Sequence, residues 1–217
     1  MLYICALCRV ISRKSLVYSA ICQVCYPGLD RLRLEEVTML LSAVRSQHSV
    51  VSLYSYEGLI RELVLNAKVR NEWGAVKACQ YLVMKGEQVE SYMKNVRGVI
   101  PAPSSMRSRI MGKYDLAFFI AEALSRKFQC PLYNLPKRFY WRFKKQSLIP
   151  REIREKNGKL LSLGQLPGLR RDPRSSLLIV DDVMTTGSTV ASIIENKNLN
   201  GVKILTFASA FNRGIHD

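Results

Sequence analysis

Apolar positions recur along the chain at two spacings, one typical of helices and one typical of strands. Helical spacing covers five segments, at residues 29–45, 59–69, 75–84, 114–128 and 188–196. Alternating or continuous short apolar runs predict strands at residues 49–56, 96–100, 177–180 and 202–208, with shorter candidates at 132–135 and 138–143. Because strands and helices alternate, we expect an α/β fold with a parallel sheet flanked by helices.

The first 30 residues break this pattern and are dominated by cysteines. Two CxxC pairs, separated by 13 residues, supply Cys5, Cys8, Cys22 and Cys25. Four thiolates on two tight turns form the tetrahedral ligand set of structural Zn²⁺ sites. The alternatives are disulfides, which a reducing compartment disfavours, and a redox CxxC, which usually belongs to a βαβ unit. We therefore predict a four-cysteine zinc knuckle over residues 1–30 and an α/β domain over residues 31–217.

The most specific motif spans residues 177–189, where an apolar strand, two acids, a loop of small residues and a helix follow one another. The carboxyl ends of parallel strands form the ligand crevice of an open α/β sheet. Loop amides and hydroxyls can surround a phosphate, which the amino terminus of the following helix also attracts. This phosphate loop consists of Thr185, Thr186, Gly187, Ser188 and Thr189.

The two acids, Asp181 and Asp182, repel phosphate but suit the 2′ and 3′ hydroxyls of a ribose. They are the candidate catalytic residues, and a metal-binding aspartate pair is the alternative. Residues 177–189 resemble the ribose-5-phosphate signature of the type I phosphoribosyltransferases. The resemblance implies that fold and a ribose 5-phosphate or phosphoribosyl pyrophosphate (PRPP) ligand, with Mg²⁺ at the departing pyrophosphate.

Nearly the whole chain also resembles the competence protein F family, in which a four-cysteine zinc module precedes a phosphoribosyltransferase-like domain. The matching positions are the two CxxC pairs, Tyr56, Gly58, the helix 59–63, Lys68, Pro101, Pro103, Gln146, Ile149, Arg154 and Asn157. The resemblance implies a factor of natural transformation that handles incoming single-stranded DNA beside a competence helicase or DNA-translocation proteins. It also implies that Lys68 binds the pyrophosphate or a backbone phosphate, and a solvated lysine at the end of a helix is the alternative.

Charge adds a second candidate surface. The chain has 33 Lys and Arg against 17 Asp and Glu, a formal charge of +16. Residues 101–175 hold 17 of these bases and 5 of these acids, so this third carries +12. Within it, residues 137–145 interleave cations with aromatics, a pattern of single-strand binding, although a solvated amphipathic strand is the alternative. The candidate nucleic-acid ligands are Lys137, Arg138, Arg142, Lys144, Lys145 and Arg154.

No run of the sequence resembles a targeting signal or a membrane span, because the apolar runs are strand-sized and Arg9 interrupts the first of them. We therefore expect a cytoplasmic protein without membrane insertion. Three functions remain open: a DNA-uptake factor, an active phosphoribosyltransferase of nucleotide metabolism, and a PRPP-sensing regulator that binds nucleic acid. The chain departs from the family at Ser104 and at residues 111–115, so the sequence leaves enzymatic activity undecided.

Overall fold

The computed structural model describes residues 3–12, 15–17, 20–34, 50–104, 108, 110–133, 176–197, 199 and 202–210. The predicted strand at 138–143 lies outside these residues. So do the six basic residues proposed to contact nucleic acid, Lys137, Arg138, Arg142, Lys144, Lys145 and Arg154.

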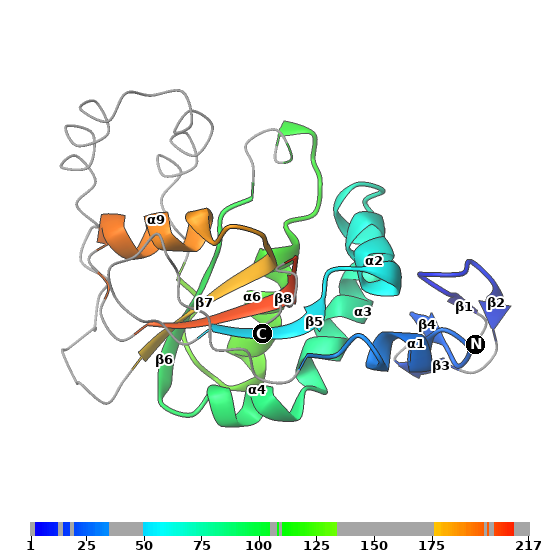
Figure 1. The fold of residues 1–217 in the computed structure, drawn as a ribbon, viewed down its shortest axis with the longest axis horizontal. Coiled ribbons are helices and arrows are strands. Elements are labelled where there is room, and N and C mark those ends of the chain that lie inside the picture. Colours follow the sequence, from blue (N-terminus) through cyan, green and yellow to red (C-terminus); the bar gives the residue numbers. More distant parts are fainter. Residues whose placement is uncertain are drawn as a thin grey trace, which may run out of the picture.

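A parallel four-stranded sheet forms the centre of the molecule, with strand order β5-β8-β7-β6. Its strands are β5 (Val50–Ser55), β6 (Val96–Pro101), β7 (Ser176–Met184) and β8 (Lys203–Ser209). The register pairs Ile179 with Ile204 and Val180 with Leu205. The predicted parallel α/β architecture is therefore confirmed (Figure 1).

Helices cover both faces of this sheet, as alternation along β7 requires. Leu178 and Val180 belong to a core shared with α3 (Trp73–Met84) and α6 (Leu116–Lys127), against which α2 (Gly58–Lys68) also packs. Leu177 and Ile179 face the opposite core, which α9 (Ser188–Lys197) closes. A short helix, α4 (Glu87–Tyr92), precedes β6 and was not predicted.

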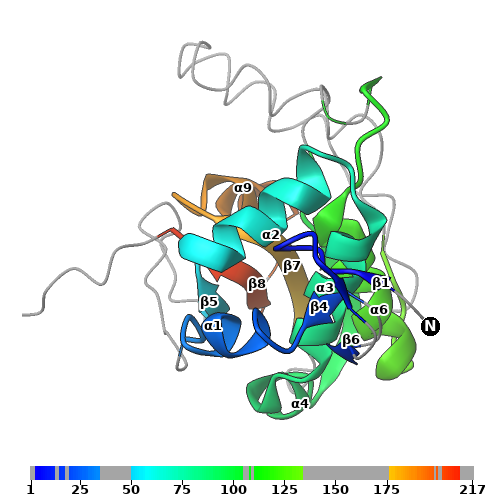
Figure 2. The ribbon, with the colours of Figure 1, turned by 90° about the vertical axis from the view of Figure 1, so that its right-hand side faces the viewer.

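The cysteine-containing segment packs against α2 and α3 (Figure 2). It consists of β1 (Tyr3–Ile4), β2 (Ile11–Ser12), β3 (Ser15–Val17), β4 (Ile21–Cys22) and α1 (Tyr26–Asp30). Its buried residues Ala6, Ala20, Ile21 and Leu29 belong to the same core as α2 and α3. Asn66 of α2 donates its side-chain amide to the carbonyl of Ala6 at 2.6 Å. The predicted boundary at residue 30 stays a prediction.

The predicted helix at 29–45 is wrong over its first part. Helix α1 ends at Asp30, and Arg33 forms an antiparallel bridge with Tyr54. The amide of Leu34 donates to the carbonyl of Leu53 at 2.9 Å, and Ser55 donates to Leu32 at 2.8 Å. The edge strand β5 thus offers backbone partners that override the helical spacing. Residues 35–45 lie outside the described part of the chain.

Of the predicted strand at 132–135, the described residues 132 and 133 contain a single parallel bridge, from Leu132 to Val99, and residues 134–135 lie outside the described part. In the described part of the chain, no helix is both long enough and apolar enough to cross a membrane.

Candidate functional site

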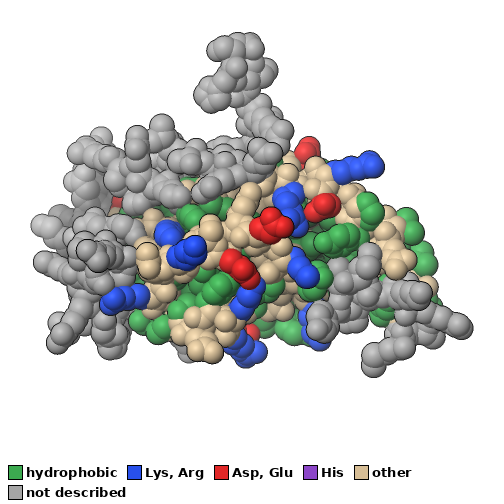
Figure 3. Space-filling model, turned by 90° about the horizontal axis from the view of Figure 1, so that it is seen from below, with side chains coloured by type: hydrophobic (Ala, Val, Ile, Leu, Met, Phe, Trp, Pro, Cys, Tyr) green, Lys and Arg blue, Asp and Glu red, His purple; other side chains and the backbone are tan. Residues whose placement is uncertain are grey.

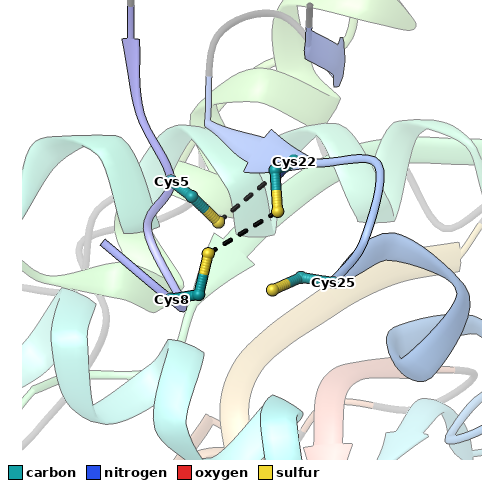
Figure 4. Close-up of side chains that lie close together, drawn as sticks. All are labelled: Cys5, Cys8, Cys22 and Cys25. Carbon is teal, nitrogen blue, oxygen red and sulfur yellow. Dashed lines mark hydrogen bonds between the residues drawn. The ribbon is translucent and has the colours of Figure 1, made fainter. Parts of the chain in front are cut away.

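The four cysteines of the two CxxC pairs converge on one point (Figure 4). Their sulfur atoms all lie within 4.8 Å of one another, and the Sγ atoms of Cys8 and Cys22 are 3.6 Å apart. Four sulfurs at the usual Zn–S bond length of about 2.3 Å stand about 3.8 Å apart in a tetrahedron. The predicted cluster is therefore confirmed, and its four thiols can bind a metal ion such as zinc.

Backbone amides around Cys5 favour its thiolate, the form that binds metal. The amides of Leu7 and Cys22 point at its Sγ atom, at 3.5 Å and 3.4 Å. Burial raises the pKa of Cys5, but amides from Cys8, Cys22 and Leu7 outweigh burial and lower the pKa to about 7. All six cysteines of the chain are free in the structure.

A second cluster lies near the carboxyl end of β7, where strand, acids, loop and helix follow in the predicted order, although β7 continues past its predicted end at residue 180 to Met184. Asp181 and Asp182 are consecutive in the strand, and Asp182 is the more buried of the two. Asp182 lies on the side of α2, because its carboxylate contacts Lys68. Asp181 is close enough for the charges of both Asp182 and Lys68 to act on it.

Lys68, the last residue of α2, brings its ammonium to the carboxylate of Asp182 at 2.8 Å. Burial lowers the pKa of Lys68, but the charge and hydrogen bond of Asp182 outweigh burial and raise it. The resemblance assigned Lys68 to a phosphate. The structure places its ammonium beside Asp182, one of the two predicted ribose acids. There it can neutralise this carboxylate or attract a phosphate.

Among the described residues, no cation forms an ion pair with Asp181 as Lys68 does with Asp182. Burial, followed by the negative charge of Asp182, raises the pKa of Asp181 to about 7. Lys68 acts in the opposite direction but does not offset these two effects. A titrating carboxyl group at a strand end is typical of functional sites, where like charges are held together.

Asp115 joins this cluster, and sequence reasoning gave it no chemical role. It caps α6 by accepting a hydrogen bond from the amide of Phe118 at 3.2 Å. Burial raises the pKa of Asp115, and Asp182 raises it further while Lys68 lowers it. Its position before a helix was a signal for a cap, but no sequence signal placed it near residues 68 and 182.

The phosphate loop connects β7 to α9 and is open to solvent. Thr185, Thr186 and Ser188 are exposed, Thr189 is half-buried, and Gly187 is buried with a φ of 68°. The hydroxyl oxygens of Thr186 and Ser188 lie 3.1 Å apart. The hydroxyl of Thr186 also accepts a hydrogen bond from the backbone amide of Ser188 at 3.4 Å. Hydroxyls, a left-handed glycine and a helix amino terminus therefore occupy one turn, as the motif predicted.

The structure describes none of the six basic residues predicted to bind nucleic acid, so that surface stays a prediction. The face seen from below mixes basic and acidic side chains among hydrophobic ones and presents no uniform basic surface in the part of the chain that is described (Figure 3). Comparison with protein-family models and with curated proteins finds no match to this chain.

Proposed function

We propose that this protein has a type I phosphoribosyltransferase-like domain that binds a ribose 5-phosphate group at the carboxyl end of β7. The observation that carries the proposal is the placement of Asp181, Asp182 and the loop 185–189 around one strand end. The acids accept hydrogen bonds, as the ribose hydroxyls require, and the neighbouring loop donates them, as the phosphate requires.

Each part of the site has its own role in this proposal. Asp181 and Asp182 accept hydrogen bonds from the ribose hydroxyls, and the turn around Gly187 holds the 5′-phosphate. The ammonium of Lys68 lies 2.8 Å from the carboxylate of Asp182, so it neutralises this carboxylate and places a positive charge beside the sugar. When PRPP is the ligand, Mg²⁺ would supply charge neutralisation at its pyrophosphate.

We further propose that the protein is a cytoplasmic factor that handles single-stranded DNA during natural transformation, beside a helicase or translocation proteins. Support comes from the competence protein F resemblance and from the +12 carried by residues 101–175. A polymer of phosphates is the ligand for which such an extended basic segment is suited. The cysteine cluster, with zinc bound, would stabilise the amino-terminal segment on α2.

An active phosphoribosyltransferase is the second candidate. Its support is the acid pair together with the hydroxyl loop, because phosphoribosyl transfer needs charge stabilisation more than a general base. Base-dependent release of pyrophosphate from PRPP would distinguish this candidate from a binding protein.

Titration calorimetry with PRPP and Mg²⁺ tests the ribose site. We expect binding by the wild type and at least about ten-fold weaker binding by the Asp181→Asn/Asp182→Asn double variant. Glu195→Gln is the matched control, because this exposed carboxylate lies on α9 away from the phosphate loop. Equal affinity in all three proteins would contradict the proposed site.

Fluorescence anisotropy with a labelled oligothymidylate tests the second part of the proposal. The logarithm of the affinity should fall linearly with the logarithm of salt concentration, because phosphate contacts release counterions. Replacing Arg138, Arg142 and Lys144 by Gln should reduce that slope. A slope near zero in the wild type would contradict DNA handling.

A further inference from the structure

Two segments distant in sequence meet beside the ribose-phosphate site and expose apolar side chains. They are the connection from α2 to α3 and the segment that precedes α6. The side chain of Asn71 joins them through two hydrogen bonds. It accepts one from the backbone amide of Tyr114 at 2.8 Å and donates one to the carbonyl of Gly112 at 3.4 Å. The exposed apolar residues of this surface, called the Trp73 surface below, are Val69, Trp73, Ile110 and Met111.

Trp73 is the largest of these side chains, and it is firmly supported. Its ring packs edge-on against Phe119 at 5.0 Å and 75°, and it lies 5.4 Å from the tilted ring of Tyr114. With these two rings behind it, 41% of Trp73 remains exposed to solvent. A fixed, exposed aromatic ring loses little entropy when a flat ligand stacks on it.

The charges next to Trp73 favour an anionic partner. The ammonium of Lys77, one turn further along α3, lies 5.8 Å from the centre of the indole ring. Glu72, in the connection from α2 to α3, forms an ion pair with Arg9, and Glu62 of α2 pairs with Arg70 at 3.1 Å. The segment before α6 adds the cation of Lys113. An apolar surface with paired glutamates and additional lysines is suited to a chain of bases and phosphates.

The Trp73 surface also continues into the ribose-phosphate site. Val69 follows directly on Lys68, whose ammonium contacts Asp182. Tyr114, which supports the indole ring, directly precedes Asp115. A nucleic acid strand bound on the Trp73 surface would therefore lie next to the predicted ribose acids.

We propose that the Trp73 surface binds single-stranded DNA by stacking an unpaired base on the indole ring, while Lys77 and Lys113 contact the flanking phosphates. The inference rests on the proposed handling of single-stranded DNA and names a contact for it outside residues 137–145. It gives the strand a stacking contact that does not depend on the identity of the base.

Anisotropy measurements with two labelled oligonucleotides of equal length test the stacking contact. One is an oligothymidylate about 15 nucleotides long, and the other is its abasic counterpart, which keeps the phosphates and lacks the bases. Trp73→Ala should weaken binding of the first by about ten-fold and leave binding of the second unchanged. Trp73→Phe, which keeps a ring on Tyr114 and Phe119, should retain most of the affinity, and thermal unfolding checks that each variant is folded.

Tryptophan fluorescence provides a readout that does not require loss of the ring. The chain has 2 tryptophans, so Trp141→Phe leaves Trp73 as the sole indole, and it keeps an aromatic ring within residues 137–145. The affinity of this variant for oligothymidylate is the reference. Oligothymidylate should quench its fluorescence and the abasic strand should not. Normal binding of oligothymidylate with no quenching and no effect of Trp73→Ala would overturn the stacking contact and leave the proposed function intact.

Two further results would also overturn the stacking contact. Equal losses by Trp73→Ala on both oligonucleotides would assign the surface to phosphate binding or to the stability of the fold. Absence of oligothymidylate binding by the wild type would overturn both the stacking contact and the proposed handling of DNA.

Discussion

The cysteine cluster and the acidic site at the end of β7 are built in opposite ways. Four ligands within 21 residues form the first, and two tight turns bring their sulfurs within 4.8 Å of one another. The second takes Lys68, Asp115 and the Asp181–Asp182 pair from three distant segments. One cluster can organise its own segment, whereas the other exists only when the sheet has formed.

The two clusters also differ in what they contribute to stability. A bound metal ion would neutralise the thiolates and stabilise the amino-terminal segment. Three carboxylates at the sheet end share one close cation, Lys68, among the described residues. Burial and mutual repulsion make this second cluster costly, as expected of a site kept for binding. Substitutions in the first cluster should therefore destabilise the protein most, whereas those in the second should have smaller effects on stability and also weaken ligand binding.

The largest expected effect is that of Cys22→Ser. Cys22 is buried and its sulfur lies 3.6 Å from that of Cys8, so the variant loses one of four ligands. We expect loss of bound zinc, measured by elemental analysis, and a free energy of unfolding lower by more than about 3 kcal/mol. The effect should extend beyond the segment, because Ala20 and Ile21 belong to the core shared with α2 and α3.

Cys130→Ser is the matched control for this substitution, because Cys130 is 9% exposed and lies outside the cluster. It should keep one zinc per chain with a smaller loss of stability. Equal zinc content in Cys22→Ser and the wild type would show that the cluster does not hold the metal.

Asp182→Asn comes second in size. It removes the charge that faces Lys68 at 2.8 Å in a pair that is only partly open to solvent. We expect a loss of about 2 kcal/mol in the free energy of unfolding, between the values for exposed and buried pairs. Chemical denaturation measures it, and Lys68→Met/Asp182→Asn should recover part of the loss because neither charge then remains unpaired. A double variant as unstable as the sum of the single ones would contradict the coupling.

The difference between the clusters also explains what the sequence could and could not predict. The CxxC spacing places both pairs of thiols locally, so the cluster was predictable from four residues. The motif at 177–189 correctly predicted the strand, loop and helix around Asp181. The Lys68–Asp182 pair and the approach of Asp115 depend on how α2 and α6 pack, which no local spacing encodes. The same limit produced the error at residues 31–34 of the predicted helix at 29–45, where pairing with β5 outweighed helical spacing.

A pH dependence is the third expectation, and it concerns Asp181. Its pKa in the folded protein is about 7, above the value near 3.9 of an unfolded chain. Between these values the folded state binds more protons, so stability falls as pH rises from about 4 to about 7. Asp181→Asn should flatten this part of the profile, measured by denaturation at several pH values, and should weaken PRPP binding. Burial also raises the pKa of Asp115, so an unchanged slope in Asp181→Asn would assign the titration to Asp115.

Gly187→Ala should have the smallest effect on stability and a clear effect on function. Gly187 has a φ of 68°, where an alanine costs about 1 kcal/mol in backbone strain. Gly74→Ala is the control, because Gly74 lies in α3, and an added Cβ there meets nothing within 4 Å. That control should leave stability unchanged or raise it slightly, since alanine favours a helix. Calorimetry should show weaker PRPP binding for Gly187→Ala alone, because relief of the strain would turn the loop amides away from the phosphate. Equal affinities of Gly187→Ala and Gly74→Ala for PRPP would show that the turn at Gly187 does not bind the phosphate. Only the acids at the end of β7 would then support the proposed ligand site.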